Sequence, residues 1–452
     1  MIEVAIVGAG IAGLAAGWEL IQRGVRPVIF ERTSRPGGVI LTERADGFVI
    51  EAGPDSVLVQ KPAAVDLCRE LGIADRLIPT LEPRTAFVIR HGTLHPLPEA
   101  SVLGLPTRIA PLLTSSLFSW PAKLRLASER FIPPHPRADE SIGEFILRRF
   151  GREARHYVAE PLLAGIHAGD VDQLSVHALF PALAEAERTH GSVLKALTTR
   201  PTASSSSGAF VSLPGGMTEL VESLAGKLGA SAVQYNVPVQ TIAGDGPYTI
   251  RFEAGTAIEA RAVIVATPAW AAASLIETID ADLASICRAI PYTSSATASF
   301  GLRRDQVRHS LNGTGFVVPS SERRAVMAAT WVSSKWPHRA PEGHVLIRGF
   351  VGGALDPEIV DQSDVAIADA VYADLADRLG ITGRPGLTRV YRWPHSSAQY
   401  HVGHLARVRS IDERLSRRPG LLLTGSAYRG TGIPDTIADA RETAARAAEF
   451  IR

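Results

Sequence analysis

The chain has 452 residues, enough for more than one domain, and 46% of them are apolar. Its formal net charge of +1 gives no whole-molecule attraction to nucleic acid, so no nucleic-acid partner is expected. The two cysteines, Cys68 and Cys287, lie far apart, which argues against a disulfide framework, a metal site or a redox pair.

The N-terminus and the length of the apolar runs indicate where in the cell the protein is located. Met1 to Glu3 leads directly into an apolar run, which leaves no room for a signal peptide. No apolar run reaches the roughly 20 residues that cross a bilayer. We therefore expect a cytoplasmic protein.

The first 60 residues predict a strand, a helix and two further strands. Residues 3–8 form an apolar run typical of a buried strand, and residues 11–22 carry helical periodicity before Gly24, which is placed to end the helix. Residues 26–32 and 48–56 predict two more strands. A strand, a helix and a strand at this spacing are typical of a doubly wound parallel sheet.

Helical periodicity dominates the region from about 100 to 200. The helical runs are 119–131, 141–169 and 177–197, and the serine-rich run 202–209 predicts a loop. Further along, the expected elements are a turn and a helix in 210–229, a buried strand over 260–270, a helix over 363–380, and a strand, Gly-rich turn and long helix from 420 to the end.

Gly8, Gly10 and Gly13 form a G-x-G-x-x-G pattern between the first strand and the first helix. The first glycine permits a tight turn, the second lets the backbone approach a pyrophosphate, and the third lets helix and strand pack closely. The N-terminus of the helix offers free N–H groups to the phosphates. Glu31, about 20 residues further on, is placed to accept a hydrogen bond from a ribose hydroxyl. The pattern predicts a bound dinucleotide.

Two further glycine-rich segments favour FAD over a nicotinamide cofactor. Glu31 would face the 2′-phosphate of NADP, which argues against that cofactor. Gly37 and Gly38 allow a second close backbone approach, and residues 425–435 form a third turn before a helix. Three separate segments for one extended ligand predict FAD.

These motifs carry a family resemblance. "GAGIAGLAAGWEL" (8–20), "ERTSRPGGV" (31–39) and "GSAYRGTGIPDTI" (425–437) together resemble the flavin-containing amine oxidase superfamily. The stretches 160–181 and 392–404, with "YRGTGIPD", are similar to the oxygen-dependent protoporphyrinogen and coproporphyrinogen oxidases of haem synthesis. The resemblance implies an α/β fold: an FAD-binding Rossmann-like domain of the GR2 type, a mixed-sheet substrate domain and a helical insertion.

The resemblance also assigns FAD contacts to matching positions. Val237 matches the residue whose backbone would meet the adenine. Ser426, Thr431, Gly432 and Ile433 would lie near the isoalloxazine. The amine oxidases usually carry arginine at the position of Val39. The porphyrinogen oxidases tolerate other residues there, so Val39 favours a resemblance to them. The full set is Gly8, Gly10, Gly13, Glu31, Arg32, Gly38, Val39, Gly53, Pro54, Asp55, Ser56, Val237, Ser426, Thr431, Gly432 and Ile433.

The implied reaction is the oxidation of a porphyrinogen to a porphyrin. In each of three two-electron rounds, a hydride leaves a tetrapyrrole carbon for flavin N5, a proton leaves nitrogen, and dioxygen reoxidises the flavin to give hydrogen peroxide. Because the flavin carries this chemistry, we expect no catalytic side chain, only an apolar cavity with a few polar partners. We slightly prefer protoporphyrinogen IX over coproporphyrinogen III, because the segment 109–131 is apolar. Ferrochelatase is a candidate recipient of the product, and the oligomeric state is not indicated.

Substrate contacts are marked less clearly than cofactor contacts. Some relatives carry an arginine that pairs with a propionate; this chain lacks one at the matching position, and the nearest candidates are Arg84 and Arg90. His167 is a third candidate, although a structural role is more common for such a histidine. Lys335 and Arg348 are expected to be solvated.

The segment 109–131 has two interpretations. It sets four apolar side chains beside aromatic and cationic ones, a composition that favours a helix lying on a membrane surface. A lid over the substrate cavity accounts for the same residues, and both can hold. The apolar side chains are Leu112, Leu113, Leu117 and Phe118, and their neighbours are Trp120, Lys123, Arg125 and Arg130.

We expect the domains to interleave along the chain. The FAD-binding domain would collect 1–60, 210–270 and 400–452, the substrate domain 61–100 and 271–399, and the helical insertion 101–209. Two alternatives stay open: an amine or polyene oxidase of the same fold, and a binding protein without flavin turnover, similar to the GDP-dissociation inhibitors.

Overall fold

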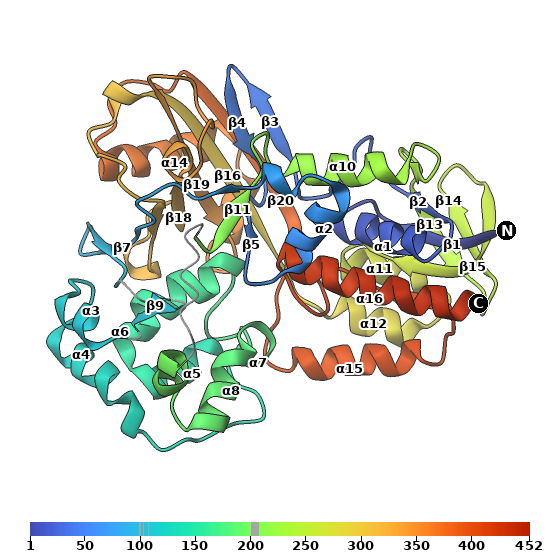
Figure 1. Cartoon of the computed structure of the whole chain (residues 1–452), viewed down its shortest axis with the longest axis horizontal. Coiled ribbons are helices and arrows are strands. Elements are labelled where there is room, and N and C mark those ends of the chain that lie inside the picture. Colours follow the sequence, from blue (N-terminus) through green and yellow to red (C-terminus); the bar gives the residue numbers. More distant parts are fainter. Residues whose placement is uncertain (99–100, 103, 107, 200–207) are drawn as a thin grey trace.

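The computed structural model describes residues 1–98, 101–102, 104–106, 108–199 and 208–452. Two large sheets and a group of helices make up this part of the chain, with the helical group at the end opposite both termini (Figure 1). The expected loop over 202–209 lies outside the described residues except for its last two positions.

The first sheet is mostly parallel and has the N-terminal strand near its middle. Its parallel pairs join strands from the beginning, the middle and the end of the chain, so the sheet forms only when distant segments meet. In spatial order its strands are β12 (Val233–Gln234), β2 (Pro27–Phe30), β1 (Ile2–Val7), β15 (Ala257–Val265), β14 (Tyr248–Phe252) and β13 (Val239–Ala243), with β21 (Leu421–Leu423) beside the end of β15.

Helices cover both faces of this sheet because its central strands are apolar on both sides. On β1, Val4 and Ile6 belong to one core, and Ala5 and Val7 belong to the other. This arrangement confirms the expected α/β, doubly wound fold. The first core includes α1 (Ile11–Gln22), α2 (Ala63–Leu71), α10 (Thr218–Leu228) and α16 (Ile433–Ile451), and the second includes α11 (Ala269–Ile276), α12 (Ala281–Arg288) and α15 (His404–Leu415).

The second sheet is antiparallel except for one parallel pair, β17 with β7. It packs against α14 (Asp364–Leu379), the helix expected over 363–380, which Ser363 caps through a hydrogen bond to the N–H of Ala366. In spatial order the strands are β20 (Leu387–Ala398), β16 (Tyr292–Arg303), β19 (His344–Gly352), β18 (Ala328–Trp331), β17 (Gly315–Val317), β7 (Ala86–Arg90) and β8 (Thr93–Pro96).

The strand expected over 48–56 is shorter than predicted and belongs to neither large sheet. Among the described strands, β4 (Phe48–Glu51) pairs with β3 (Thr42–Ala45) alone, and the two project together at the top of Figure 1. Pro54 has no N–H to continue the ladder, so the chain turns away after Ala52. The remaining strands are β5 (Val57–Leu58), β6 (Ile78–Pro79), β9 (Ser101–Val102), β10 (Leu105–Pro106) and β11 (Phe210–Ser212).

The helical insertion has its own apolar core. The run 141–169 is helical, as expected, but it is not one α-helix: Gly151 has a φ of 91° and ends α5, and Pro161 lies inside a π-helix over Arg155–Ala164. π-Helical turns are frequent at functional sites. The helices of the insertion are α3 (Ile109–Thr114), α4 (Trp120–Ala127), α5 (Ile142–Phe150), α6 (Arg152–Ala154), α7 (Val176–Leu179), α8 (Pro181–His190) and α9 (Val193–Thr199).

Among the described residues, no helix is both long enough and apolar enough to cross a bilayer. Cys68 and Cys287 are free and buried.

Candidate cofactor and substrate site

The carboxyl ends of β1, β2, β15 and β21 meet at one edge of the first sheet. The turns that follow these strands touch one another. A Cβ added to Gly8 would lie 3.0 Å from the carbonyl oxygen of Ala266, and one added to Gly425 would lie 3.9 Å from the Cβ of Ala12. Open α/β sheets bind their ligands at this edge.

Gly8 and Gly13 have the geometry expected of a tight turn and of a close contact between strand and helix. Gly8 has a φ of 102°, and its N–H donates to the carbonyl of Phe30 at 2.8 Å. A Cβ on Gly13 would lie 1.9 Å from the carbonyl oxygen of Gly8, so no side chain fits there. Within the part of the chain that the structure describes, a Cβ on Gly10 would meet nothing within 4 Å, and no side chain caps α1. The start of α1 is therefore open to a phosphate.

Glu31 and Val237 lie beside this turn. One carboxylate oxygen of Glu31 accepts from the N–H of Ala9 at 2.8 Å, and the other accepts from the N–H and the hydroxyl of Thr33. Val237 donates its N–H to the Glu31 carbonyl at 2.9 Å. Arg32, by contrast, is exposed and forms no hydrogen bond or ion pair with the described residues.

The second glycine-rich segment adjoins the first turn. Arg35 shapes it by donating three hydrogen bonds, between 2.7 and 3.2 Å, to carbonyls of its own segment. Gly37 forms a parallel bridge with Gly10. Val39 is 44% exposed, and its carbonyl lies so close to Gly53 that a Cβ there would come within 2.0 Å of the oxygen. The segments around Gly38 and Gly53 are thus brought together at the edge of the first sheet.

Asp55 is buried and pairs with two cations. Lys335 lies 2.8 Å from its carboxylate, Arg348 lies at 3.9 Å, and the hydroxyl of Ser56 donates to it at 2.6 Å. Burial opposes ionisation of Asp55, but the two cations outweigh that effect and hold the pKa of this carboxyl well below its usual range.

The expectation that Lys335 and Arg348 are solvated is wrong. Arg348 is only 3% exposed because the second sheet packs against the segment 51–56. A signal for this was present in the sequence: Arg348 is the one charged residue inside the apolar run 345–352 of β19, and an isolated charge in such a run needs a buried partner.

Three consecutive carbonyls before Pro54 are held by the second sheet. Arg348 donates to the carbonyls of Glu51 and Gly53 at 2.7 and 2.9 Å. The carbonyl of Ala52 accepts from the indole of Trp393 at 2.8 Å and from the hydroxyl of Thr297 at 3.3 Å. Strands β16, β19 and β20 thereby fix the start of the Gly53–Ser56 segment.

The C-terminal turn is held by its own following helix. Asp439 of α16 accepts from the hydroxyl of Thr424 at 2.6 Å and from the N–H of Gly425 at 3.2 Å. Gly432 caps the N-terminus of α16, so Ser426, Thr431, Gly432 and Ile433 all lie in the turn or at the first residue of that helix. Lys61 pairs with Asp435 at 2.6 Å and joins the chain after β5 to this turn.

His167 contacts this turn directly. Its Nδ1 lies 3.3 Å from the hydroxyl of Thr431, and the edge of its ring faces Phe180 with the ring centroids 6.0 Å apart. Burial and the nearby charge of Lys61 lower the pKa of His167 to about 4, so the imidazole is neutral at neutral pH.

Arg84 and Arg90 are engaged by neighbouring protein groups. Arg90 donates to the carbonyl of Leu117 at 2.5 Å, lies 3.7 Å from Glu153, and stands over the ring of Tyr157. Arg84 lies 3.2 Å from Glu82 and donates to the carbonyl of Thr80. Their assignment to a substrate carboxylate stays a prediction.

The geometry suits a long nucleotide at the edge of the first sheet. Comparison with known protein families identifies the class of protein to which the chain belongs. A model of the flavin-containing amine oxidoreductases matches residues 11–450. The chain belongs to this family. This flavin-containing amine oxidoreductase is thus an FAD-dependent enzyme, and the resemblance seen in its motifs is confirmed.

Relatives of this amine oxidoreductase include porphyrinogen oxidases. The chain is 38% identical to coproporphyrinogen III oxidase of Bacillus subtilis (strain 168), over 96% of this chain and 95% of that protein. It is 25% identical to the chloroplastic protoporphyrinogen oxidase of Nicotiana tabacum, over 100% and 86%. A crystal structure from Exiguobacterium sp. 255-15, of a protein proposed to be a protoporphyrinogen oxidase, matches with a TM-score of 0.87 and 32% identity over 98% of both chains.

Proposed function

We propose that this enzyme oxidises a porphyrinogen to a porphyrin in haem synthesis. The observation that carries the proposal is the 38% identity, over 96% of the chain, with a protein named coproporphyrinogen III oxidase. For the same reason we propose coproporphyrinogen III as the substrate, in place of the preference for protoporphyrinogen IX that the apolar segment 109–131 suggested. We further propose dioxygen as the electron acceptor, with hydrogen peroxide as the by-product.

The residues that would hold FAD follow from the site. We assign the pyrophosphate to the Gly8–Gly13 turn and the start of α1, the ribose to Glu31, and the adenine to the backbone of Val237. The other contacts we propose are Arg32, Gly38, Val39, Gly53, Pro54, Asp55, Ser56, Ser426, Thr431, Gly432 and Ile433. When bound, FAD supplies the acceptor for the hydride that leaves the substrate carbon.

The chain's own part in the reaction is binding and orientation. The Asp55 ion cluster and the Gly-rich turns hold the site rigid, which keeps reacting atoms aligned. We propose that His167, which lies next to Thr431, forms a hydrogen bond to the tetrapyrrole. We propose no side chain as acid, base or nucleophile. We also propose the interleaved division into FAD-binding, substrate and helical domains.

An aerobic assay tests the proposed function. Coproporphyrinogen III and protoporphyrinogen IX are added separately to the purified holoenzyme, and porphyrin fluorescence and peroxide are followed. We expect catalysed appearance of both products, with higher kcat/KM for coproporphyrinogen III. Peroxide release with amines or polyenes and none with either porphyrinogen would contradict the proposal and favour another oxidase of this family.

We propose that the segment 109–131 touches the inner surface of the cell membrane of a cytoplasmic enzyme. Trp120, Leu124 and Phe131 are 65%, 69% and 79% exposed. Lys123 lies 4.6 Å from the ring centre of Trp120, and Arg130 lies 5.5 Å from that of Phe131. Leu112, Leu117 and Phe118 lie buried in the core of the insertion, and Lys123 is only 7% exposed. The surface we propose therefore consists of Trp120, Leu124 and Phe131 with the exposed Arg130, and exposed aromatic side chains beside a cation suit a lipid interface. Release at the membrane would allow hand-over of the porphyrin product to ferrochelatase.

Vesicle binding tests this contact. The double variant Trp120→Ala, Phe131→Ala is expected to bind anionic vesicles about tenfold or more weakly than wild type in a sedimentation assay, because two apolar side chains no longer enter the interface. Phe450→Ala, which removes an exposed aromatic side chain of α16, is the matched control and should bind as wild type does. Equal binding by the double variant, or none by wild type, would contradict the contact.

A further inference from the structure

The segment 397–404 begins at the end of β20. It lies between two turns of the proposed site, the turn that contains His167 and the turn 425–432 before α16. Its residues Gln399 and Tyr400 are neighbours and are each only 1% exposed. Because successive side chains of an extended segment point to opposite sides, these two reach different turns. The segment lies within the stretch 392–404, to which the proposed reaction gives no role.

Tyr400 spans the C-terminal turn. Its hydroxyl donates to the carbonyl of Ser426 at 2.9 Å and accepts from the N–H of Gly430 at 2.8 Å. The ring of His404 stacks on Tyr400, with centroids 3.7 Å apart, and its Nε2 lies 2.9 Å from the carbonyl of Tyr428. One hydroxyl therefore sets the distance between the two ends of the turn that we assign to the isoalloxazine.

Gln399 holds the turn that contains His167, the residue that we assign to the substrate. Its Nε2 donates to the carbonyl of His167 at 2.9 Å and to the hydroxyl of Thr293 at 3.0 Å. Its Oε1 is buried and has no hydrogen-bond partner among the described residues, and it lies beside Gly169, where an added Cβ would be 2.5 Å from it. The amide is thus kept in place although one of its atoms is unsatisfied, which costs stability.

The backbone of the same segment is bound to the helical insertion. The carbonyl of Tyr400 accepts from the N–H of Ser175 at 2.7 Å, and the N–H of Val402 donates to the carbonyl of Gln173 at 2.9 Å. The direct contact between the two turns, from His167 to Thr431, is longer at 3.3 Å and weaker. The adjacent pair, Gln399 and Tyr400, therefore defines the spacing of the turns better than their own contact does.

We infer that Tyr400 and Gln399 are positioning residues that fix the flavin side and the tetrapyrrole side of the site at a set distance. Tyr400 acts on the flavin through the 426–430 turn, and Gln399 acts on the tetrapyrrole through the His167 turn. Neither touches a reacting atom. The inference rests on the proposed function and divides it into two separable effects.

Two single variants test the inference. Tyr400→Phe keeps the stack on His404 but leaves two backbone groups of the turn unpaired, and we expect FAD to dissociate about tenfold more readily, with a shifted flavin absorption spectrum and midpoint potential. Gln399→Leu removes the anchor of His167, and we expect the porphyrinogen KM to rise about tenfold while FAD affinity, spectrum and potential stay as in wild type. Tyr400→Phe should change only the FAD affinity, the flavin spectrum and the midpoint potential, and Gln399→Leu should change only the porphyrinogen KM.

Matched controls separate positioning from a general loss of stability. Tyr391→Phe removes the hydroxyl of another β20 tyrosine, which bonds to Glu43 at 2.6 Å, and Gln306→Leu removes an exposed amide. Both should leave FAD affinity and KM unchanged. Thermal unfolding of every variant is measured in parallel.

The possible results decide the inference in either direction. It is overturned if Tyr400→Phe retains wild-type FAD affinity, spectrum and potential, or if both variants change the same readouts in proportion to their loss of thermal stability. Failure of the proposed function would look different: the wild-type holoenzyme would bind FAD but oxidise no porphyrinogen. In that case the flavin readouts of Tyr400→Phe still support or overturn the role of Tyr400.

Discussion

Replacing Gly10 by alanine is expected to weaken FAD binding strongly while costing the apoprotein little stability. A Cβ at Gly10 meets no atom of the described residues within 4 Å, so the added methyl group has room in the apoprotein until a pyrophosphate approaches the turn. Loss of several charge-assisted N–H bonds to phosphate should weaken FAD binding by about a hundredfold or more. FAD titration of the apoprotein and thermal unfolding measure the two effects separately.

Gly13→Ala gives the contrasting result. Its Cβ would lie 1.9 Å from the backbone oxygen of Gly8, so strand and helix must separate. We expect this variant to lose about 1–3 kcal/mol of stability and also to lose FAD. Gly226→Ala in α10, where a Cβ also meets nothing, should leave FAD binding unchanged. Retention of FAD by the Gly10 variant would contradict the assignment of the pyrophosphate to this turn.

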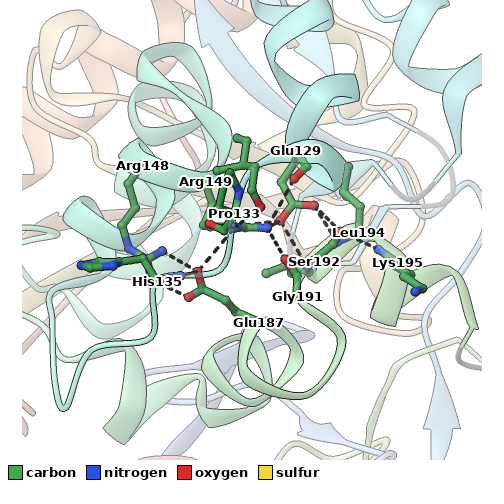
Figure 2. Close-up of polar contacts among 12 residues, drawn as sticks. Glu129, Pro133, His135, Arg148, Arg149, Glu187, Gly191, Ser192, Leu194 and Lys195 are labelled. Atoms are coloured by element: carbon green, nitrogen blue, oxygen red, sulfur yellow. Dashed lines mark hydrogen bonds and ion pairs between the residues drawn. The ribbon is translucent and has the colours of Figure 1, made fainter.

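The largest effect on stability is expected at Arg149, in the helical insertion. Its guanidinium is fully buried and donates to the carboxylate of Glu129 at 2.8 Å through Nε, and its Nη1 lies 3.4 Å from Glu187 (Figure 2). Glu129 in turn accepts from the hydroxyl of Ser192 at 2.6 Å. The network ties α5, α8 and the start of α9 to the turn that follows α4.

Arg149→Met should destabilise the insertion by about 3–5 kcal/mol, because removing one partner leaves the buried carboxylate of Glu129 unpaired. Urea unfolding, with loss of the first sheet and of the insertion followed separately, measures the effect. The control Arg188→Ala breaks an exposed pair with Glu185 and should leave stability unchanged. Equal stability of the Arg149 variant and wild type would contradict a stabilising role for the network.

The same network predicts acid sensitivity. Burial opposes ionisation of Glu187, but hydrogen bonds from Arg148 outweigh it and lower the pKa of this carboxyl below its usual range. A carboxyl with a lowered folded-state pKa stabilises the fold above its unfolded pKa, about 4.3, and that contribution is lost as the pH falls through the folded value. The insertion of wild type should therefore lose stability in acid, and Glu187→Gln should lose less.

Local chemistry explains why the cofactor turn could be predicted. The tight turn at Gly8 and the contact at Gly13 depend on residues close in sequence, and a strand and a helix of ordinary length surround them. Glu31 follows at the end of the next parallel strand, so its position beside the turn is a matter of sheet geometry. Fold class and cofactor therefore followed from short segments.

Long-range packing explains what could not be predicted. The isolated charge of Arg348 in β19 indicates that it is buried, but its partner Asp55 is far away in the sequence, and their pairing depends on how the second sheet meets the segment after β4. The β3–β4 hairpin separated from both sheets for the same reason. The role of Gln399 depends on an approach to Gly169 that no periodicity reveals. Partners separated by hundreds of residues leave no mark on local spacing.

Anaerobic mixing of the FAD-loaded enzyme with one equivalent of coproporphyrinogen III tests most directly whether a flavin lies beside a tetrapyrrole in this site. Without dioxygen the flavin cannot be reoxidised, so its visible absorption should bleach in a single phase as the substrate loses two electrons. Admission of air should restore the absorption. A flavin that stays oxidised with coproporphyrinogen III and protoporphyrinogen IX, but bleaches with an amine, would contradict a porphyrinogen site.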